Sequence, residues 1–322
     1  MIIIRVLCIF SIVLVGLISS RLKWLDLNSS KYLSKIVINI ASPCVIISSM
    51  TGHKLTHDNF ISTWLIFGLL FAGYILMIGI STLLTKAFRV EENQQGVYKN
   101  FFLLTNNGFM GIPVAMVMFS KTGVFYLVIA NIVMNIFVYS IGILNLRHKS
   151  NDASSNLEQA ASFKRMLKDL CNIPMVSSLI GLLIFFLQIP VQENLTFLLD
   201  TLGAMMAPLT MMIIGIQLSE SHIKRVLLNH KLTLMSLFRL IILPGIGFAV
   251  CLPLVHFGVI DKLQAAIFTI NWAFPCAAIG VVFAEEYKRD VLIASEGTFL
   301  STFFSIFTLP LFGMLLIAYS GG

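Results

Sequence analysis

The sequence predicts an all-α integral membrane protein with ten transmembrane helices, arranged as two inverted repeats of five helices each. Three observations predict this fold: an apolar composition, ten apolar runs of spanning length, and helix breakers at matching places in the two halves. Of the 322 residues, 57% are hydrophobic and 11% are charged, whereas soluble domains average about 45–50% and about 25%. An ordinary water-soluble domain is therefore excluded.

Each apolar run is long enough to cross a hydrocarbon core, which needs about 20 residues. The loops at alternate positions along the chain hold 17 of the 22 Lys and Arg residues, and the other loops hold 3. Because positive residues are retained on the cytoplasmic side, we expect a multi-pass protein of the cell membrane with both termini outside. The ten predicted spans are residues 2–20, 32–51, 61–85, 97–119, 123–145, 173–190, 194–218, 231–256, 263–284 and 292–319.

The longest polar stretch divides the chain into two halves within one membrane domain. We assign residues 1–145 to the first five-helix repeat, residues 146–172 to a cytoplasmic linker and residues 173–322 to the second repeat. Five is an odd number, so two halves with the same fold must be inverted relative to each other in the membrane. This is the repeat plan of many secondary transporters.

Helix breakers lie in the second and fourth span of each half. The second and seventh spans contain Pro43 and Pro208, and the fourth and ninth contain residues 106–113 and 271–275. Non-helical backbone at membrane depth is tolerated only where it is buried in protein or lines a water-filled cavity. The sequence therefore predicts broken helices in spans four and nine, and further helix breaks at Pro43 and Pro208. If they cross at the breaks, their helix N-termini converge on one site that can receive an anion.

A few polar side chains lie inside the predicted spans. Arg239 is the deepest charge, about 12 Å into span eight at 1.5 Å per residue. It pairs either with an anionic substrate or with a carbonyl or acid of a neighbouring helix. Asn131 and Asn135 share one face of span five, where they line the pathway or join two helices. The five cysteines form no metal-binding pattern, and we expect no metal and no cofactor.

The chain resembles the auxin efflux carrier family, whose bacterial members include malate permeases. The resemblance covers nearly the whole chain and is carried by the segments SKIVINIASPCVIISSM, TNNGFMGIPVAMVMF, LGAMMAPLTMMIIGIQL and NWAFPCAAIGVVFAEEYKRDVLIASEGTFLSTFFSIFTLPLF. It implies a scaffold group and a transport group of helices, an X-shaped crossing of the broken helices, elevator-type alternating access and organic anions as substrates. It places the substrate site at Asn106, Asn107, Gly108, Gly111, Pro113, Asn271 and Pro275, to which we add Arg239.

We therefore expect a secondary active transporter of small organic anions such as malate-like carboxylates. Coupling to protons or to sodium stays open, as does a homodimer, and a sodium-coupled symporter of bile-acid type is the first alternative. A channel or a solute sensor is a further alternative. The sequence has no P-loop, H-E-x-x-H or G-x-S-x-G motif, so we expect no ATPase or other enzyme activity. The basic residues are scattered through loops, which excludes a nucleic-acid partner and leaves the lipid bilayer.

Overall fold

The computed structural model describes residues 2–147, 171–219 and 226–321, and within these residues the chain is helical apart from short connections. Besides the long apolar segments given below, the structure has two shorter apolar helical stretches, Leu7–Arg21 and Ile173–Leu187. The prediction of an all-α membrane protein is confirmed, whereas most of the linker predicted at 146–172 lies outside the described residues. Among the described residues, six segments are long and apolar enough to cross a membrane. They are Leu27–Thr51, His57–Ala87, Asn107–Leu146, Glu193–Ser219, His230–His256 and Val291–Ser320.

The helices follow one another along the chain with four π-helical turns, marked η, between them. They are α1 (Ile2–Arg21), α2 (Leu27–Ile36), η1 (Val37–Ala41), α3 (Ser42–Thr51), α4 (His57–Ala87), α5 (Gln95–Leu103), η2 (Asn107–Gly111), α6 (Ile112–Phe137), η3 (Val138–Gly142), α7 (Ile143–Leu146), α9 (Ile173–Leu187), α10 (Glu193–Gly203), α11 (Met206–Ser219), α13 (His230–Leu237), η4 (Phe238–Ile242), α14 (Leu243–His256), α15 (Lys262–Ala273), α16 (Ile279–Glu286) and α17 (Val291–Ser320).

Several helices begin at a polar capping side chain. Each of these side chains accepts a hydrogen bond from the backbone N–H three residues later, which satisfies one of the N–H groups that the first helical turn leaves unpaired. The capping residues are Asp26, Thr56, Asn172, Asn229, Asp261 and Asp290. By contrast, η2 and α16 begin without a capping side-chain hydrogen bond.

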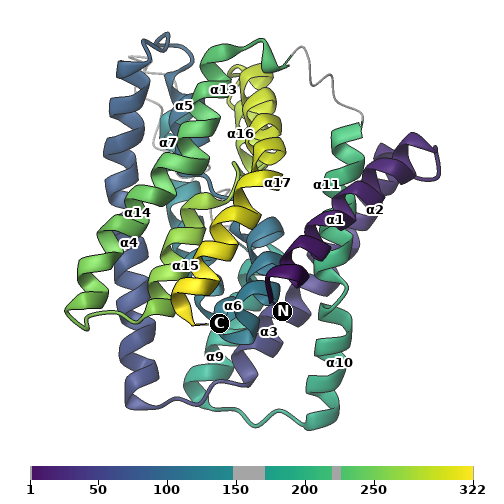
Figure 1. Cartoon of the computed structure of the whole chain (residues 1–322), viewed down its shortest axis with the longest axis vertical. Coiled ribbons are helices and arrows are strands. Elements are labelled where there is room, and N and C mark those ends of the chain that lie inside the picture. The colour runs from purple at the N-terminus through teal and green to yellow at the C-terminus, as the bar shows by residue number, and fades with distance from the viewer. Residues whose placement is uncertain (1, 148–170, 220–225, 322) are drawn as a thin grey trace, which may run out of the picture.

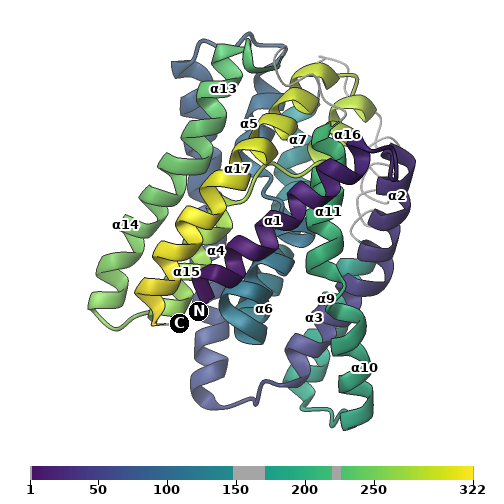
Figure 2. The same cartoon turned by 45° about the vertical axis from the view of Figure 1, so that its right-hand side comes forward.

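The helices form two groups that lie side by side (Figures 1 and 2). In the first group, α1 packs along α11, and α3 packs against α9 and α10. In the second group, α4 packs against α5 and α6, α14 against α15, and α17 against α13, α15 and α16. Contacts between the groups run mainly through α6, which touches α3, α9 and α11.

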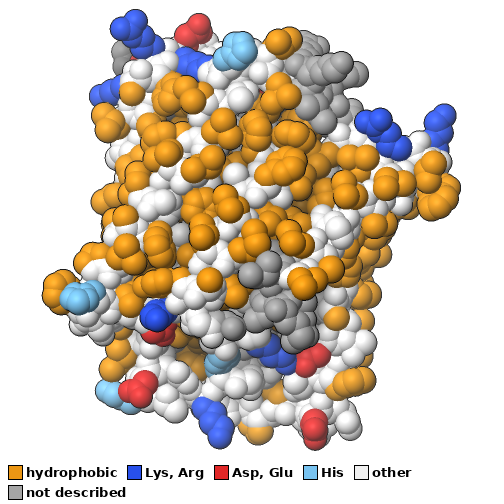
Figure 3. Space-filling model, in the orientation of Figure 1, with side chains coloured by type: hydrophobic (Ala, Val, Ile, Leu, Met, Phe, Trp, Pro, Cys, Tyr) orange, Lys and Arg blue, Asp and Glu red, His pale blue; other side chains and the backbone are white. Residues whose placement is uncertain are grey.

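The surface matches the apolar composition. Figure 3 shows hydrophobic side chains covering the middle of the visible face, with charged side chains and histidines gathered toward its two ends. Large apolar side chains stay exposed along the helices, for example Ile75 at 54% and Phe307 at 65%. In water such a continuous exposed area would drive association. In a bilayer it faces lipid.

The two helix breaks predicted at Pro43 and Pro208 need correction. At Pro43 the chain stays helical, because the preceding turn η1 widens and thereby accommodates a proline that lacks an N–H and crowds the turn before it. The interruption near Pro208 is short and precedes it, since α10 ends at Gly203 and α11 begins at Met206. Pro208 itself lies in the first turn of α11, where a missing N–H costs little.

Candidate functional site

The two broken helices cross at their breaks. After α5 the chain is extended at Leu104 (φ −85°, ψ 105°), and after α15 it is extended at Phe274 (φ −69°, ψ 146°). Thr105 and Cys276 form an antiparallel bridge. The Asn106 N–H donates to the Pro275 carbonyl at 2.9 Å, and the Ala277 N–H donates to the Leu104 carbonyl at 3.1 Å. The breaks predicted in these two segments are therefore present, and they pair with each other.

A buried arginine holds the carbonyl ends of the crossing. Arg239, in η4, is 1% exposed. Its guanidinium donates to the backbone carbonyls of Leu104 at 2.9 Å, Phe274 at 3.2 Å and Pro275 at 3.3 Å, and also to that of Phe101. The C-terminal ends of helices carry partial negative charge, so this cation neutralises the ends of α5 and α15. The sequence left two roles open for Arg239. In the structure it contacts the carbonyls of neighbouring helices.

Two asparagines and a tyrosine join the crossing from its buried side. The Asn107 amide donates to the Asn271 side-chain carbonyl at 2.8 Å, and both residues are fully buried. The Tyr74 hydroxyl, from α4, lies 2.7 Å from the Thr105 hydroxyl. Hydrogen bonds of this kind between buried groups fix a single arrangement, because each unpaired polar atom would cost free energy. These residues therefore position the breaks.

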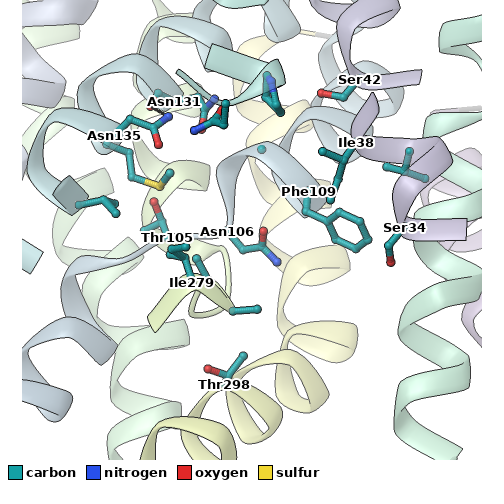
Figure 4. Close-up of a pocket in the computed structure, with 18 of the residues that line it drawn as sticks. Ser34, Ile38, Ser42, Thr105, Asn106, Phe109, Asn131, Asn135, Ile279 and Thr298 are labelled. Atoms are coloured by element: carbon teal, nitrogen blue, oxygen red, sulfur yellow. Dashed lines mark hydrogen bonds between the residues drawn. The ribbon is translucent and has the colours of Figure 1, made fainter. Parts of the chain in front are cut away.

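A cavity of about 460 Å³ lies against the crossing. On one side it is bounded by the breaks, α6 and α17, and on the other by α2, η1, α9 and α11 (Figure 4). None of its lining side chains in the described part of the chain carries a charge. The polar ones are amides and hydroxyls: Ser34, Ser42, Thr105, Asn106, Asn131, Asn135, Tyr139, Asn172, Gln217, Thr298 and Thr302.

The residues predicted for the site separate into four places. Asn106 and Gly108 line this first cavity. Asn107 and Asn271 form the buried pair, and Gly111 packs so closely against the Phe274 ring that an added Cβ would lie 2.9 Å from it. The remaining residues contribute elsewhere: Pro275 through its carbonyl, Arg239 at the carbonyl ends, and Pro113 in a second, smaller cavity.

Sequence reasoning missed several cavity residues for which a signal was present. Ser34 and Ser42 are eight apart, with Ile38 midway between them, and Thr298 and Thr302 are four apart. Residues four apart share one face of a helix, and a stripe of hydroxyls in an apolar run indicates a face turned away from lipid. Both stripes line the first cavity. Asn131 and Asn135, which the sequence singled out, line it as well.

Comparison with known proteins identifies the family. The profile described as membrane transport protein matches residues 1–313. The chain belongs to this family. It is the family of the auxin efflux carriers that the sequence resembles, and its members are transporters, not enzymes. An uncharacterized transporter of Methanocaldococcus jannaschii is 25% identical over 318 residues, covering 97% of this chain and 98% of its own length. An uncharacterized transporter of Methanothermobacter thermautotrophicus is 25% identical over 317 residues and covers 97% of each chain.

Proposed function

We propose that this family member is a secondary active transporter that carries small organic anions, such as malate-like carboxylates, across the cell membrane. The observation that carries the proposal is the cavity that ends at two uncapped helix N-termini. Gly108 and Phe109 of η2 line it from one break, and Ala278 and Ile279 line it from the other. First-turn N–H groups point out of a helix N-terminus and carry partial positive charge. Two such ends meet at one place.

The lining chemistry supports an anion as the substrate. The first cavity holds no carboxylate among its described lining residues, while Asn106, Asn131 and Asn135 offer amide N–H donors. Its volume of about 460 Å³ lies within the range of small-molecule sites, about 300–1,000 Å³. A carboxylate can therefore be bound by backbone and amide donors alone. Neutral donors bind it reversibly, as a carrier requires.

The architecture in this proposal is the ten-span inverted repeat. The antiparallel pairing of Thr105 with Cys276 supports it, because two equivalent segments related by inversion run in opposite directions. The start of α1 and the end of α17 lie close together in the lower half of Figure 1, which agrees with an even number of spans. The ten spans are α1, α2–α3, α4, α5 with residues 107–119, residues 121–146, α9, α10–α11, α13–α14, α15–α16, and α17.

An elevator-type motion fits the two helix groups. The first cavity lies between the group that contains α2, α9 and α11 and the group that contains the crossing. A substrate bound there would travel with the crossing when the second group slides along the first. We assign the Lys- and Arg-rich loops to the cytoplasm and both termini to the outside.

Coupling to protons or to the membrane potential fits the crossing better than sodium symport does. In transporters with broken helices, unwound carbonyls and half-helix C-terminal ends coordinate the coupling cation. Here Arg239 donates to the carbonyls of Leu104, Phe274 and Pro275. A fixed guanidinium thus already supplies the positive charge at these carbonyls.

The experiment is counterflow of labelled L-malate into proteoliposomes loaded with a panel of unlabelled carboxylates. We expect saturable uptake that is stimulated from the opposite side, independent of sodium, and strongly reduced in Asn106→Ala. Asn28→Ala is the matched control, because Asn28 is an exposed asparagine outside the cavity. If no carboxylate drives exchange in folded protein, the organic-anion assignment is wrong, and a linear flux without counterflow would indicate a channel.

A further inference from the structure

A second cavity, of about 240 Å³, lies next to the first and contains an ion pair. Lys121 and Asp200 both line it, with 2.7 Å between the Lys121 Nζ and an Asp200 carboxylate oxygen. The Ser48 hydroxyl donates to the other carboxylate oxygen. Lys121 belongs to α6, whereas Asp200 and Ser48 belong to α10 and α3. The pair therefore ties the two helix groups together.

The two cavities are stacked along the same helices. On α6 and the preceding turn, Gly108 lines the first cavity and Pro113 lines the second, and on α2–α3 the corresponding residues are Ser42 and Val45. Met206 lines both cavities and is itself 1% exposed. Met206 therefore lies between two compartments that are lined by the same helix groups.

From this arrangement we propose that the second cavity is the closed half of the permeation pathway, and that Lys121 is its carboxylate-binding residue, occupied by Asp200 while the pathway is shut. This inference rests on the proposed carrier function. The first cavity contains amides and hydroxyls but no cation among its described lining residues, whereas the second contains Lys121. The Asp200 carboxylate already binds the Lys121 ammonium group, so the geometry needed to bind a carboxylate is present.

The ion pair is suited to open and close. The side chains of Lys121 and Asp200 are 39% and 41% exposed, and partly exposed pairs contribute little net free energy because water competes for both charges. Separation of the helix groups would pull Asp200 away from Lys121 and leave the ammonium group free to bind an incoming anion. A substrate carboxylate would then replace Asp200 on the same ammonium group.

Cysteine labelling tests closure without any need for transport. The five native cysteines are replaced and Ala207→Cys is placed in the second cavity. A membrane-impermeant maleimide is then added on the side of the membrane on which Lys121 lies, and the rate of its reaction with the introduced cysteine is measured. We expect Asp200→Asn and Lys121→Gln each to speed labelling about threefold to fivefold, the amount that a partly exposed ion pair can restrain. The double exchange Lys121→Asp with Asp200→Lys is expected to slow it again.

Glu193→Gln is the matched control, since Glu193 is an exposed acid on the same helix, α10, as Asp200. Labelling in Asp200→Asn at the rate of this control would overturn the closure. Failure of the exchanged pair to restore slow labelling would also overturn the closure. A restraint that depends on opposite charges survives their exchange, whereas a restraint that depends on packing does not.

Protection from labelling tests the anion site. In the Asp200→Asn background, acetate, succinate and L-malate are expected to slow labelling at residue 207, whereas uncharged glycerol is not. Adding Lys121→Gln is expected to remove this protection. If none of the three carboxylates protects, the anion role of Lys121 is wrong. Protection by carboxylates without counterflow would overturn the carrier function alone. Counterflow combined with a labelling rate that carboxylates do not change would overturn the second site alone.

Discussion

The side-chain nitrogen of Asn107 donates to the side-chain oxygen of Asn271 at 2.8 Å, across the crossing of the two broken helices. Both side chains are fully buried and neither lines the first cavity. The remaining side-chain atoms of the pair, the Asn107 oxygen and the Asn271 nitrogen, have no hydrogen-bond partner among the described residues. The hydrogen bond between the amides is thus a direct side-chain contact between the two broken helices.

We predict that Asn107→Ala and Asn271→Ala each destabilise the fold by about 1–3 kcal/mol, because each leaves its partner buried with an unpaired polar atom. The double variant should cost less than the sum of the single variants, since it removes both polar groups at once. Thermal unfolding in detergent measures the shift, with Asn28→Ala as the exposed control. Additive losses would mean that the two amides act independently.

A second prediction concerns Arg239. Arg239→Met should destabilise the protein by about 2 kcal/mol or more, because charged hydrogen bonds to the four carbonyls are lost. Arg239→Lys should recover only part of the loss, since an ammonium group lacks the planar fork of donors. The exposed Arg21, replaced by Lys, is the control for thermal unfolding. Normal stability combined with weaker substrate binding would instead assign Arg239 to the substrate.

The sequence is sufficient to predict the two breaks, whereas their crossing was implied only by the family resemblance. Residues 106–113 and 271–275 place Gly, Pro and Asn within apolar runs, and the cost of a continuous helix there is a local property. The same reasoning is wrong at Pro43, because a π-helical turn accommodates the proline without an interruption. A proline therefore indicates a distortion, and only the added glycines and amides indicate a break.

The composition of the cavity was less accessible to sequence reasoning. Ser34 and Thr298 line the same cavity from helices far apart in the sequence, and such a meeting depends on how whole helix groups pack. The pairing of Lys121 with Asp200 is of the same kind. Local patterns can show that each residue faces protein or water, whereas its partner is set by tertiary packing.

The close packing of α1 against α11 depends on two glycines. A Cβ added at Gly16 would lie 2.2 Å from the Met212 carbonyl oxygen, and one added at Gly215 would lie 2.1 Å from the Val13 carbonyl oxygen. Gly16→Ala and Gly215→Ala should therefore push the helices apart and cost about 1–3 kcal/mol each. Gly68→Ala is the control, because nothing lies within 4 Å of its added Cβ. Equal melting temperatures for Gly16→Ala and Gly68→Ala would show that α1 moves freely on α11.

The last prediction concerns the turn that precedes Lys121. Ser120 adopts φ 57° and ψ −158° within α6, a region of backbone conformation that is essentially restricted to glycine. Ser120→Gly should therefore relieve strain and stabilise the protein by about 1 kcal/mol, after allowance for the greater freedom of glycine in the unfolded chain. Ser120→Val should destabilise it, because a β-branched side chain tolerates positive φ poorly. Ser295→Gly, at an exposed position inside α17, should instead lower the melting temperature. The opposite signs at positions 120 and 295 separate relief of strain from a general effect of glycine, and a lower melting temperature in both variants would contradict the strain at Ser120.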